Sequence, residues 1–252
     1  MMSKHRLLSV PPLALLALAM ACGESEERKK IENEDPTMDN PVAYFGMEAC
    51  TCYEYVTVDN SDTRRLGVAV ERVDDFYSDV AGKDVHAVVY RLGGAVQKTY
   101  VVDPTNPDLR LTRVKTGAMA GDDEWRMSPG MSLAHWLEDT TKKVTVQSQV
   151  TRYQNAIPVD DEPQTLDIHT LLGKETPVKA SLDDGATEQD YQATLIEYSG
   201  TPWSEPKRWF VPEVGTVQLE FNGTRWILRN KRTLAGGCPG DTVKDICGTK
   251  AP

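Results

Sequence analysis

The strongest constraint on the fold is a strict alternation of apolar and polar residues in TVQLEFNGTRWILRN, residues 216–230. Such alternation is typical of β-strands that bury one side and expose the other. Asn222-Gly223 interrupts the alternation, and this dipeptide favours a type I′ turn because both residues tolerate a positive φ. The pattern predicts a hairpin in which Leu219 lies opposite Trp226 on the buried side.

The same alternation recurs along the chain and predicts the fold class. A second hairpin is expected in VHAVVYRLGGAVQKTYVVD, with its turn at Gly93-Gly94. Further strands are expected at residues 53–59, 66–73, 109–116, 143–153, 177–182 and 191–198. Only residues 74–82 and a stretch after Ser132 have a helical pattern. We therefore expect a mainly β protein, with a large curled antiparallel sheet that forms an open or half β-barrel or a sandwich, and one or two short helices.

The first 21 residues have the pattern of a leader peptide. Lys4 and Arg6 precede an apolar run that is shorter than the roughly 20 residues needed for a membrane-spanning helix. The run ends in AMAC, which resembles a bacterial lipobox, although Leu18 stands four rather than three residues before Cys22. We expect residues 1–21 to be a lipoprotein signal peptide and Cys22 to carry the lipid. The alternative is an ordinary leader cleaved after A-x-A.

The residues after the leader divide into three parts. Residues 22–40 are dense in charges of both signs, which predicts a disordered tether. Residues 41–232 are expected to form a single β-rich domain, followed by a tail, residues 233–252, tied down by disulfides. Without Lys4 and Arg6 the basic residues fall from 28 to 26 against 38 acidic ones, so the mature chain has a net charge of −12. This balance argues against nucleic acid as a partner, since binding to phosphates needs clustered basic residues.

Four cysteines remain once Cys22 is set aside: Cys50, Cys52, Cys238 and Cys247. An even number in an exported chain indicates disulfides. On one strand Cys50 and Cys52 would be too far apart to bond with each other, so we expect both to reach the tail. A Cys52–Cys238 bond would disfavour the unfolded chain by about 5 kcal/mol. The alternatives are a local Cys238–Cys247 bond with the other two free, and a metal site, for which the spacing is not that of a zinc ribbon.

The segment KRWFVPEVGTVQLEFNGTRWILR, residues 207–229, resembles the closing hairpin of a group of bacterial secreted proteins and lipoproteins of unknown function. In that group an aromatic pair precedes x-P-x-V-G-x-V and a final hairpin. The matching residues are Trp209, Phe210, Pro212, Gly215, Asn222 and Gly223. The resemblance implies an extended β-sheet fold and transfers no catalytic residues. From the residues alone, Pro212 ends one element, Gly215 permits a bend or bulge, and the aromatic pair covers the end of the sheet.

The sequence contains no recognisable catalytic or metal-binding motif. The histidines outside the leader, His86, His135 and His169, are scattered, and no G-x-S-x-G, S-x-x-K or H-E-x-x-H stretch is found. Pairs of aspartates fall at expected turns, where an ordinary loop role is favoured over calcium binding. These pairs are Asp74-Asp75, Asp122-Asp123, Asp160-Asp161 and Asp183-Asp184. We therefore expect no enzyme activity, no cofactor and no metal.

The expected function combines the leader with the curled sheet. We expect a lipoprotein of the bacterial cell envelope, attached to the outer membrane through Cys22, that carries a hydrophobic ligand in the hollow of its sheet. The tryptophans could line this hollow, but for most of them we expect a core position: Trp125, Trp136, Trp203, Trp209 and Trp226. The alternative is a structural lipoprotein that docks to another envelope protein. A hydrolase would need a histidine and a carboxylate to converge in a cleft.

Overall fold

The computed structural model describes residues 41–59, 63–73, 85–103, 109–117, 123–132 and 143–233, together with Cys247. Several sequence-based predictions lie outside these residues. They are the signal peptide, the lipidated Cys22, the tether, the helix at 74–82, the helix after Ser132, His135 and Cys238.

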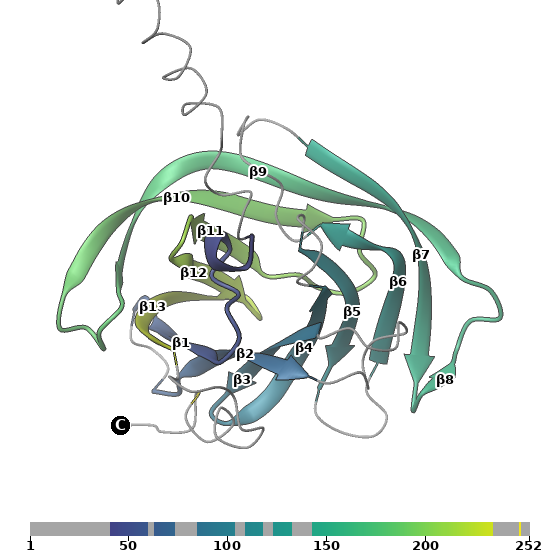
Figure 1. Cartoon of the computed structure of the whole chain (residues 1–252), viewed down its shortest axis with the longest axis horizontal. Helices are drawn as coiled ribbons and strands as arrows, with labels where there is room; N and C mark the ends of the chain where they lie inside the picture. Colours follow the sequence, from purple (N-terminus) through teal and green to yellow (C-terminus); the bar gives the residue numbers. More distant parts are fainter. Residues whose placement is uncertain are drawn as a thin grey trace, which may run out of the picture. The chain divides into compact units, whose positions relative to one another are not determined.

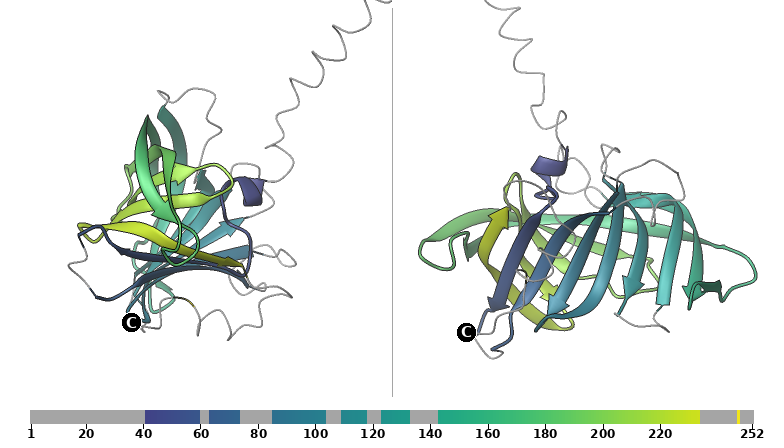
Figure 2. Two further views of the ribbon diagram at one scale, coloured as in Figure 1. Left: turned by 90° about the vertical axis from the view of Figure 1, so that its left-hand side faces the viewer. Right: turned by 60° about the horizontal axis from the view of Figure 1, so that its bottom comes forward.

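The described chain folds into one antiparallel sheet that closes into a barrel (Figure 1). Its strands are β1 (Thr51–Thr57), β2 (Leu66–Val73), β3 (Val85–Leu92), β4 (Ala95–Asp103), β5 (Arg110–Thr116), β6 (Asp123–Ser132), β7 (Lys143–Gln154), β8 (Ile157–Pro158), β9 (Gln164–Ser181), β10 (Glu188–Ser199), β11 (Lys207–Val211), β12 (Gly215–Phe221) and β13 (Thr224–Thr233). Consecutive strands pair along the chain, except that β8 pairs with β7 alone and β7 pairs with β9, and β1 pairs with β13. Figure 2 shows β1 to β6 side by side.

The predicted class, a mainly β protein with a large curled sheet, is confirmed. The sheet is a closed barrel rather than an open or half barrel. The ring also requires β7, which pairs with β9 through residues 143–150 and with β6 through residues 149–154. A short helix, α2 (Pro41–Tyr44), precedes β1. No helix among the described residues is long and apolar enough to span a membrane.

Both predicted hairpins are present. In the β12–β13 hairpin, Leu219 lies opposite Trp226, and the two turn residues, Asn222 and Gly223, have φ values of 51° and 75°. The β3–β4 hairpin turns at Gly93-Gly94, again with positive φ at both positions. The local pattern therefore predicts the register of the β12–β13 hairpin and the position of the β3–β4 turn correctly.

Apolar side chains fill the interior of the barrel. Tyr55, Leu219 and Leu228 are among the residues with almost no exposed surface, and they belong to one continuous apolar cluster. In β12 the buried and partly exposed residues alternate along the whole strand, as expected when one side faces the interior. Among the tryptophans in the described part of the chain, Trp125, Trp203 and Trp226 are buried in this cluster, which agrees with the core position expected for most of them.

A disulfide joins the first strand to the tail. Cys52 on β1 is bonded to Cys247, with an S–S distance of 2.00 Å and a sequence separation of 195 residues. Cys52, Cys247 and Ala69 form a small apolar cluster separate from the barrel core. Cys50 is also disulfide-bonded, and its partner lies outside the described residues. A cysteine of the first strand thus reaches the tail as expected, but the partner of Cys52 is Cys247 and not Cys238, and a local Cys238–Cys247 bond is excluded.

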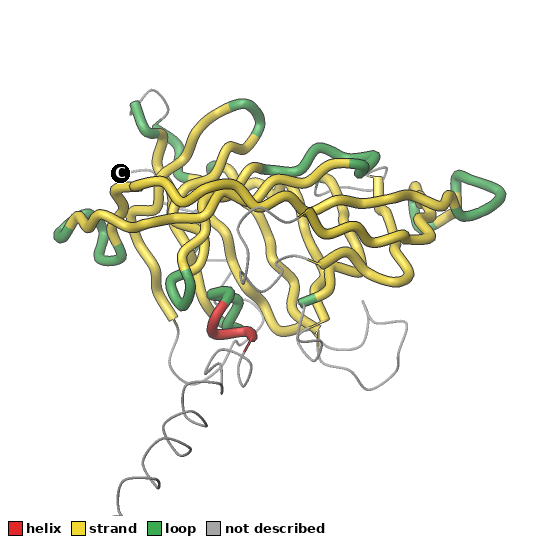
Figure 3. The backbone as a smooth tube through the Cα atoms, turned by 90° about the horizontal axis from the view of Figure 1, so that it is seen from above, coloured by secondary structure: helices red, strands yellow, loops and turns green. Residues whose placement is uncertain are grey.

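Figure 3 shows the strands of the barrel from above. The strand β9 is the longest of the described strands, with 18 residues, and it pairs with β10, which has 12 residues. Their connecting turn comes back to the β13 strand, where Asp183 forms a bridge with Asn230. Arg229 and Glu188 form an ion pair at 2.7 Å in the same region. Hydrogen bonds from Ser181 and Thr187 lower the pKa of Asp183. This aspartate therefore has the turn role expected for the Asp183-Asp184 pair.

Candidate functional site

The most distinctive part of the barrel is the end at which β4, β6, β9, β11 and β13 begin. We call this end the mouth. The connection between β10 and β11, residues 200–206, folds over it, and we call this segment the mouth loop. Trp203 of the mouth loop is only 5% exposed, and its ring lies 5.6 Å from the ring of Trp125 on β6. An indole therefore closes the barrel from above.

Glu205 anchors the mouth loop inside the barrel. Its side chain is 2% exposed, and it accepts a hydrogen bond of 2.6 Å from the Tyr100 hydroxyl on β4. The indole N–H of Trp203 donates to the other carboxylate oxygen. The ammonium group of Lys98, two residues before Tyr100, donates to the carbonyl oxygen of Ser204. Polar side chains of β4 thus hold a loop that forms no strand.

Arg208, the second residue of β11, points into the barrel directly below the mouth loop. It is 5% exposed, and its guanidinium carbon lies 5.3–6.0 Å from the ring centres of Tyr100, Tyr198 and Tyr90. Burial acts to lower the pKa of Arg208, but the tyrosines and Glu205 raise it above its ordinary value. Arg208 therefore remains a cation in an aromatic enclosure.

The ionisable neighbours of Arg208 are strongly affected by burial. Burial raises the pKa of the hydroxyls of Tyr90, Tyr100 and Tyr198, so these groups stay protonated far above neutral pH. Burial also lowers the pKa of Lys98, and Arg208 acts in the same direction while Glu205 opposes it. The interior below the mouth is therefore a small polar region within an apolar core.

Two clefts open into the mouth, one on each side of the mouth loop. The first has a volume of about 340 Å3, and Lys98, Glu205 and Phe221 contribute to its walls together with the hairpin turn Asn222-Gly223. Because Lys98 and Phe221 belong to the inward-facing set of their strands, this cleft leads from solvent to the anchored carboxylate. It gives access to the polar region without passing through the apolar core.

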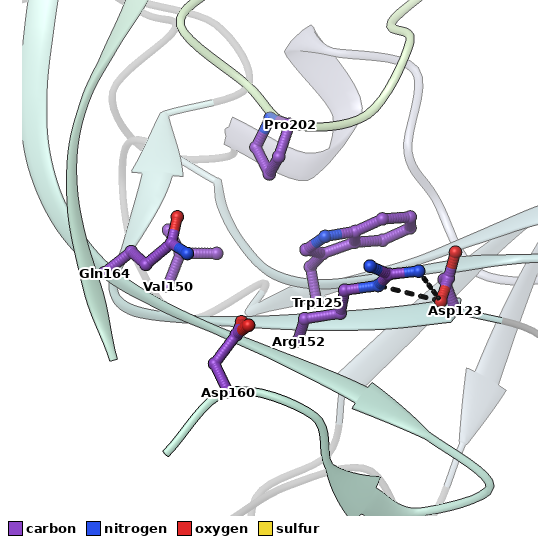
Figure 4. Close-up of a pocket in the computed structure, with 7 residues that line it drawn as sticks. All are labelled: Asp123, Trp125, Val150, Arg152, Asp160, Gln164 and Pro202. Atoms are coloured by element: carbon purple, nitrogen blue, oxygen red, sulfur yellow. Dashed lines mark hydrogen bonds and ion pairs between the residues drawn. The ribbon is translucent and has the colours of Figure 1, made fainter. Parts of the chain in front are cut away.

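The second cleft has a volume of about 380 Å3 and is shown in Figure 4. Trp125 and Pro202 lie on one side of it, and Asp160 projects from the opposite side. Arg152 on β7 forms an ion pair with Asp123 on β6, with an N–O distance of 2.8 Å. Most of these groups are polar, so this cleft suits the polar part of a ligand better than an alkyl chain.

The residues singled out in the closing hairpin have separate places. Asn222 and Gly223 line the first cleft, whereas Pro212 lies in the turn between β11 and β12 at the other end of the barrel. Trp209 is on the outer side of β11, where the guanidinium group of Arg225 lies 5.5 Å from its ring. Phe210 packs inside against Phe45, at 5.6 Å between ring centres.

Gly215 lies next to Tyr53 and Gly46 near the start of the chain. It has φ of 100°, and a Cβ on it would lie 3.2 Å from the Tyr53 hydroxyl. Its predicted role in a bend is therefore accompanied by close packing against β1.

The sequence patterns did not predict a site role for Lys98, Glu205 or Arg208. The available signal is positional, because Lys98 alternates in phase with Tyr100 and Val102, and Arg208 with Phe210, both sets being apolar and inward-facing. A charged residue at a strand position that faces the apolar interior departs from the alternation, and such departures often mark functional positions.

No arrangement resembling a catalytic or metal centre is seen in the described part of the chain. His86 bonds to the Met47 carbonyl oxygen at 3.0 Å, and His169 bonds to the Thr145 hydroxyl at 2.9 Å on a different strand. Among the described residues, no three His, Cys, Asp or Glu side chains are close enough together to hold a metal ion. Comparisons with protein-family models, with curated proteins and with solved structures find no match.

Replacing Gly200 with alanine should displace the mouth loop. Gly200 has φ of 81°, and a Cβ on it would lie 2.2 Å from the carbonyl oxygen of Asp167, which belongs to the backbone and cannot rotate away. We expect a loss of about 1–3 kcal/mol in the free energy of unfolding, measured with urea. Gly94→Ala is the matched control, since Gly94 has φ of 86° but nothing within 4 Å. If both variants lost the same free energy of unfolding, the close contact between Gly200 and Asp167 would not contribute to stability.

Proposed function

We propose that this protein is a non-enzymatic binding or carrier module for a hydrophobic ligand, attached to the bacterial outer membrane through a lipid on Cys22. A closed β-barrel with an apolar interior is compatible with holding such a ligand. The observation that carries the proposal is the mouth loop. The mouth loop covers one end of the barrel, and side-chain contacts hold it there.

The contacts of the mouth loop allow it to open without disturbing the barrel. Its anchors are the hydrogen bonds of Glu205, the hydrogen bond from Lys98 and the packing of Trp203 on Trp125. None of these is a backbone pair of the sheet. Because clefts already lie on both sides of the loop, its outward movement would uncover Trp125 and the interior below. Loops that gate binding sites are generally among the least stable parts of a fold, because few contacts must break when they open.

The test is the binding of N-phenyl-1-naphthylamine, an uncharged apolar dye whose fluorescence rises in apolar surroundings. Trp203→Ala should bind the dye about tenfold more tightly than the wild type, because a site that is mostly closed has an apparent affinity reduced by its open fraction. We expect this variant to lose about 3 kcal/mol of stability through the missing indole. Trp209→Ala is the matched control, because Trp209 lies on the outer side of the barrel.

Material from the native envelope provides a second readout. Solvent extraction of the purified protein, followed by mass spectrometry, should release a lipid or another apolar molecule, and the intact mass should show a lipid on Cys22. Failure of both Trp203→Ala and the wild type to bind the dye, with nothing extracted, would contradict the carrier function. That result would instead favour the alternative of a lipoprotein that docks to another envelope protein.

A further inference from the structure

The polar region below the mouth contains more positive than negative charge. Lys98 and Arg208 are 6% and 5% exposed, and the one carboxylate described beside them is Glu205. Two cations and one anion leave an excess of one positive charge, in a protein whose net charge is −10. Buried charges are costly unless they are paired, so this excess calls for another anion.

Arg208 is incompletely satisfied by Glu205. The closest approach between its Nη2 atom and the carboxylate is 3.8 Å, which is too long for a hydrogen bond. The Nε and Nη2 atoms of Arg208 are buried and have no hydrogen-bond partner. A guanidinium group favours two parallel hydrogen bonds to a carboxylate, and Arg208 makes neither of these bonds through Nε and Nη2. Glu205 is instead held mainly by Tyr100 and by Trp203 of its own loop.

The groups that surround the Glu205 carboxylate differ in how they are attached. Lys98 and Tyr100 are on β4 and Arg208 is on β11, so all three are fixed in the barrel wall. Glu205 and Trp203 are on the mouth loop. If this loop moves outward, the Glu205 carboxylate leaves the Tyr100 hydroxyl and the Arg208 guanidinium, and the Ser204 carbonyl oxygen leaves the Lys98 ammonium. Three donors of the barrel wall then lose these partners at the mouth.

We propose that the hydrophobic ligand carries a carboxylate, and that this carboxylate takes the place of Glu205 beside Tyr100 and Arg208 and of the Ser204 carbonyl oxygen on Lys98. The apolar part of the ligand takes the place of Trp203 beside Trp125. In the empty protein Glu205 occupies the place of the ligand headgroup. This inference rests on the proposed carrier function and adds the class of ligand, an amphiphilic carboxylic acid such as a long-chain fatty acid. The first cleft, which reaches Lys98 and Glu205, is the route for the headgroup.

The test compares cis-parinaric acid, a fluorescent long-chain fatty acid, with its uncharged methyl ester. The wild type should bind the acid more tightly than the ester. Arg208→Met should bind the acid at least about tenfold more weakly while binding the ester as before, because truncating one partner of a buried charge pair is costly. Arg225→Met is the matched control, since Arg225 is an exposed arginine beside an aromatic ring on the outer side.

Glu205→Gln provides an independent test that leaves the arginine in place. Without the competing carboxylate, this variant should bind the acid about tenfold more tightly, and the acid should raise its Tm more than it raises the Tm of the wild type. Equal binding of acid and ester in every variant would overturn the carboxylate site and leave the carrier function standing. No binding of either probe, even to Trp203→Ala, would overturn the carrier function itself. If Arg208→Met does not fold, the Glu205→Gln result decides alone.

Discussion

Raising the pH above about 10 should unfold the barrel cooperatively. Burial is the main cause that raises the pKa of each of five tyrosine hydroxyls above the ordinary value of 10.0, and these tyrosines are Tyr53, Tyr55, Tyr90, Tyr100 and Tyr198. In the unfolded chain the same hydroxyls ionise near pH 10. Above that pH the unfolded state therefore binds fewer protons than the folded state, and stability falls by up to about 1.4 kcal/mol per pH unit for each tyrosine. Lys98, whose pKa is lowered, contributes in the opposite sense only up to its ordinary pKa of 10.5.

Circular dichroism and tyrosinate absorbance, followed together in an alkaline titration, would measure this effect. The absorbance change of the five buried tyrosines should occur at the same pH as the change in circular dichroism, because the buried hydroxyls ionise only on unfolding. Tyr90→Phe should reduce the dependence of the unfolding free energy on pH by about 1.4 kcal/mol per pH unit, since one ionisation is removed. The chain has nine tyrosines, so tyrosinate absorbance equal to that of more than four tyrosines while the barrel is still folded would contradict the burial of these five side chains.

Removing the Cys52–Cys247 disulfide should lower the free energy of unfolding by about 2–5 kcal/mol. The bond closes a loop of 195 residues, and chain-entropy arguments give its upper value near 5 kcal/mol for a loop of this length. The variant Cys52→Ala with Cys247→Ala removes the bond without leaving free thiols. Urea unfolding without a reducing agent gives the free energies, and the denaturant dependence should increase in the variant because its unfolded chain is less compact.

Reduction of both proteins is the control for this measurement. A thiol reductant should destabilise the wild type more than the variant, since the variant has one fewer bond to lose. Cys50 is itself disulfide-bonded, so a second bond is still present in the variant before reduction. A difference below about 0.5 kcal/mol between the two proteins before reduction would contradict a stabilising role for this bond, because changes of that size are usual for surface substitutions.

Local patterns predicted the hairpins but not the closure of the barrel. The β12–β13 hairpin follows from alternation and one dipeptide, and its register was predicted correctly. The strand β6 was not predicted, because it contains Pro129 and Gly130, which disfavour strands, and its pairing with β5 includes an irregularity. Residues 164–176 of β9 were also not predicted as a strand, since Thr170 takes an inward position and Gly173 interrupts the pattern. The barrel closes because β7 pairs with both of these regions, β6 and the first part of β9. Local sequence patterns do not contain this information, because it depends on how distant strands pair.

The candidate site was beyond local prediction for a similar reason. Glu205 lies in a short polar segment that reads as an ordinary loop, and only the fold shows that it enters the barrel. Lys98 and Arg208 are far apart in the sequence and come together across the mouth. The resemblance of residues 207–229 to a group of secreted proteins, the leader and the lipid on Cys22 remain predictions.

The order of the strands also bears on how the protein folds. In the described sheet every pairing joins strands that follow one another closely along the chain, except the pairing of β1 with β13. Eleven of the twelve contacts around the ring can therefore form as successive short-range steps, each with a small loss of chain entropy. The β1–β13 contact alone must wait for the two ends to meet. We expect the rate of folding to be limited by this last contact, and joining the two ends of the domain by a short linker should make folding faster.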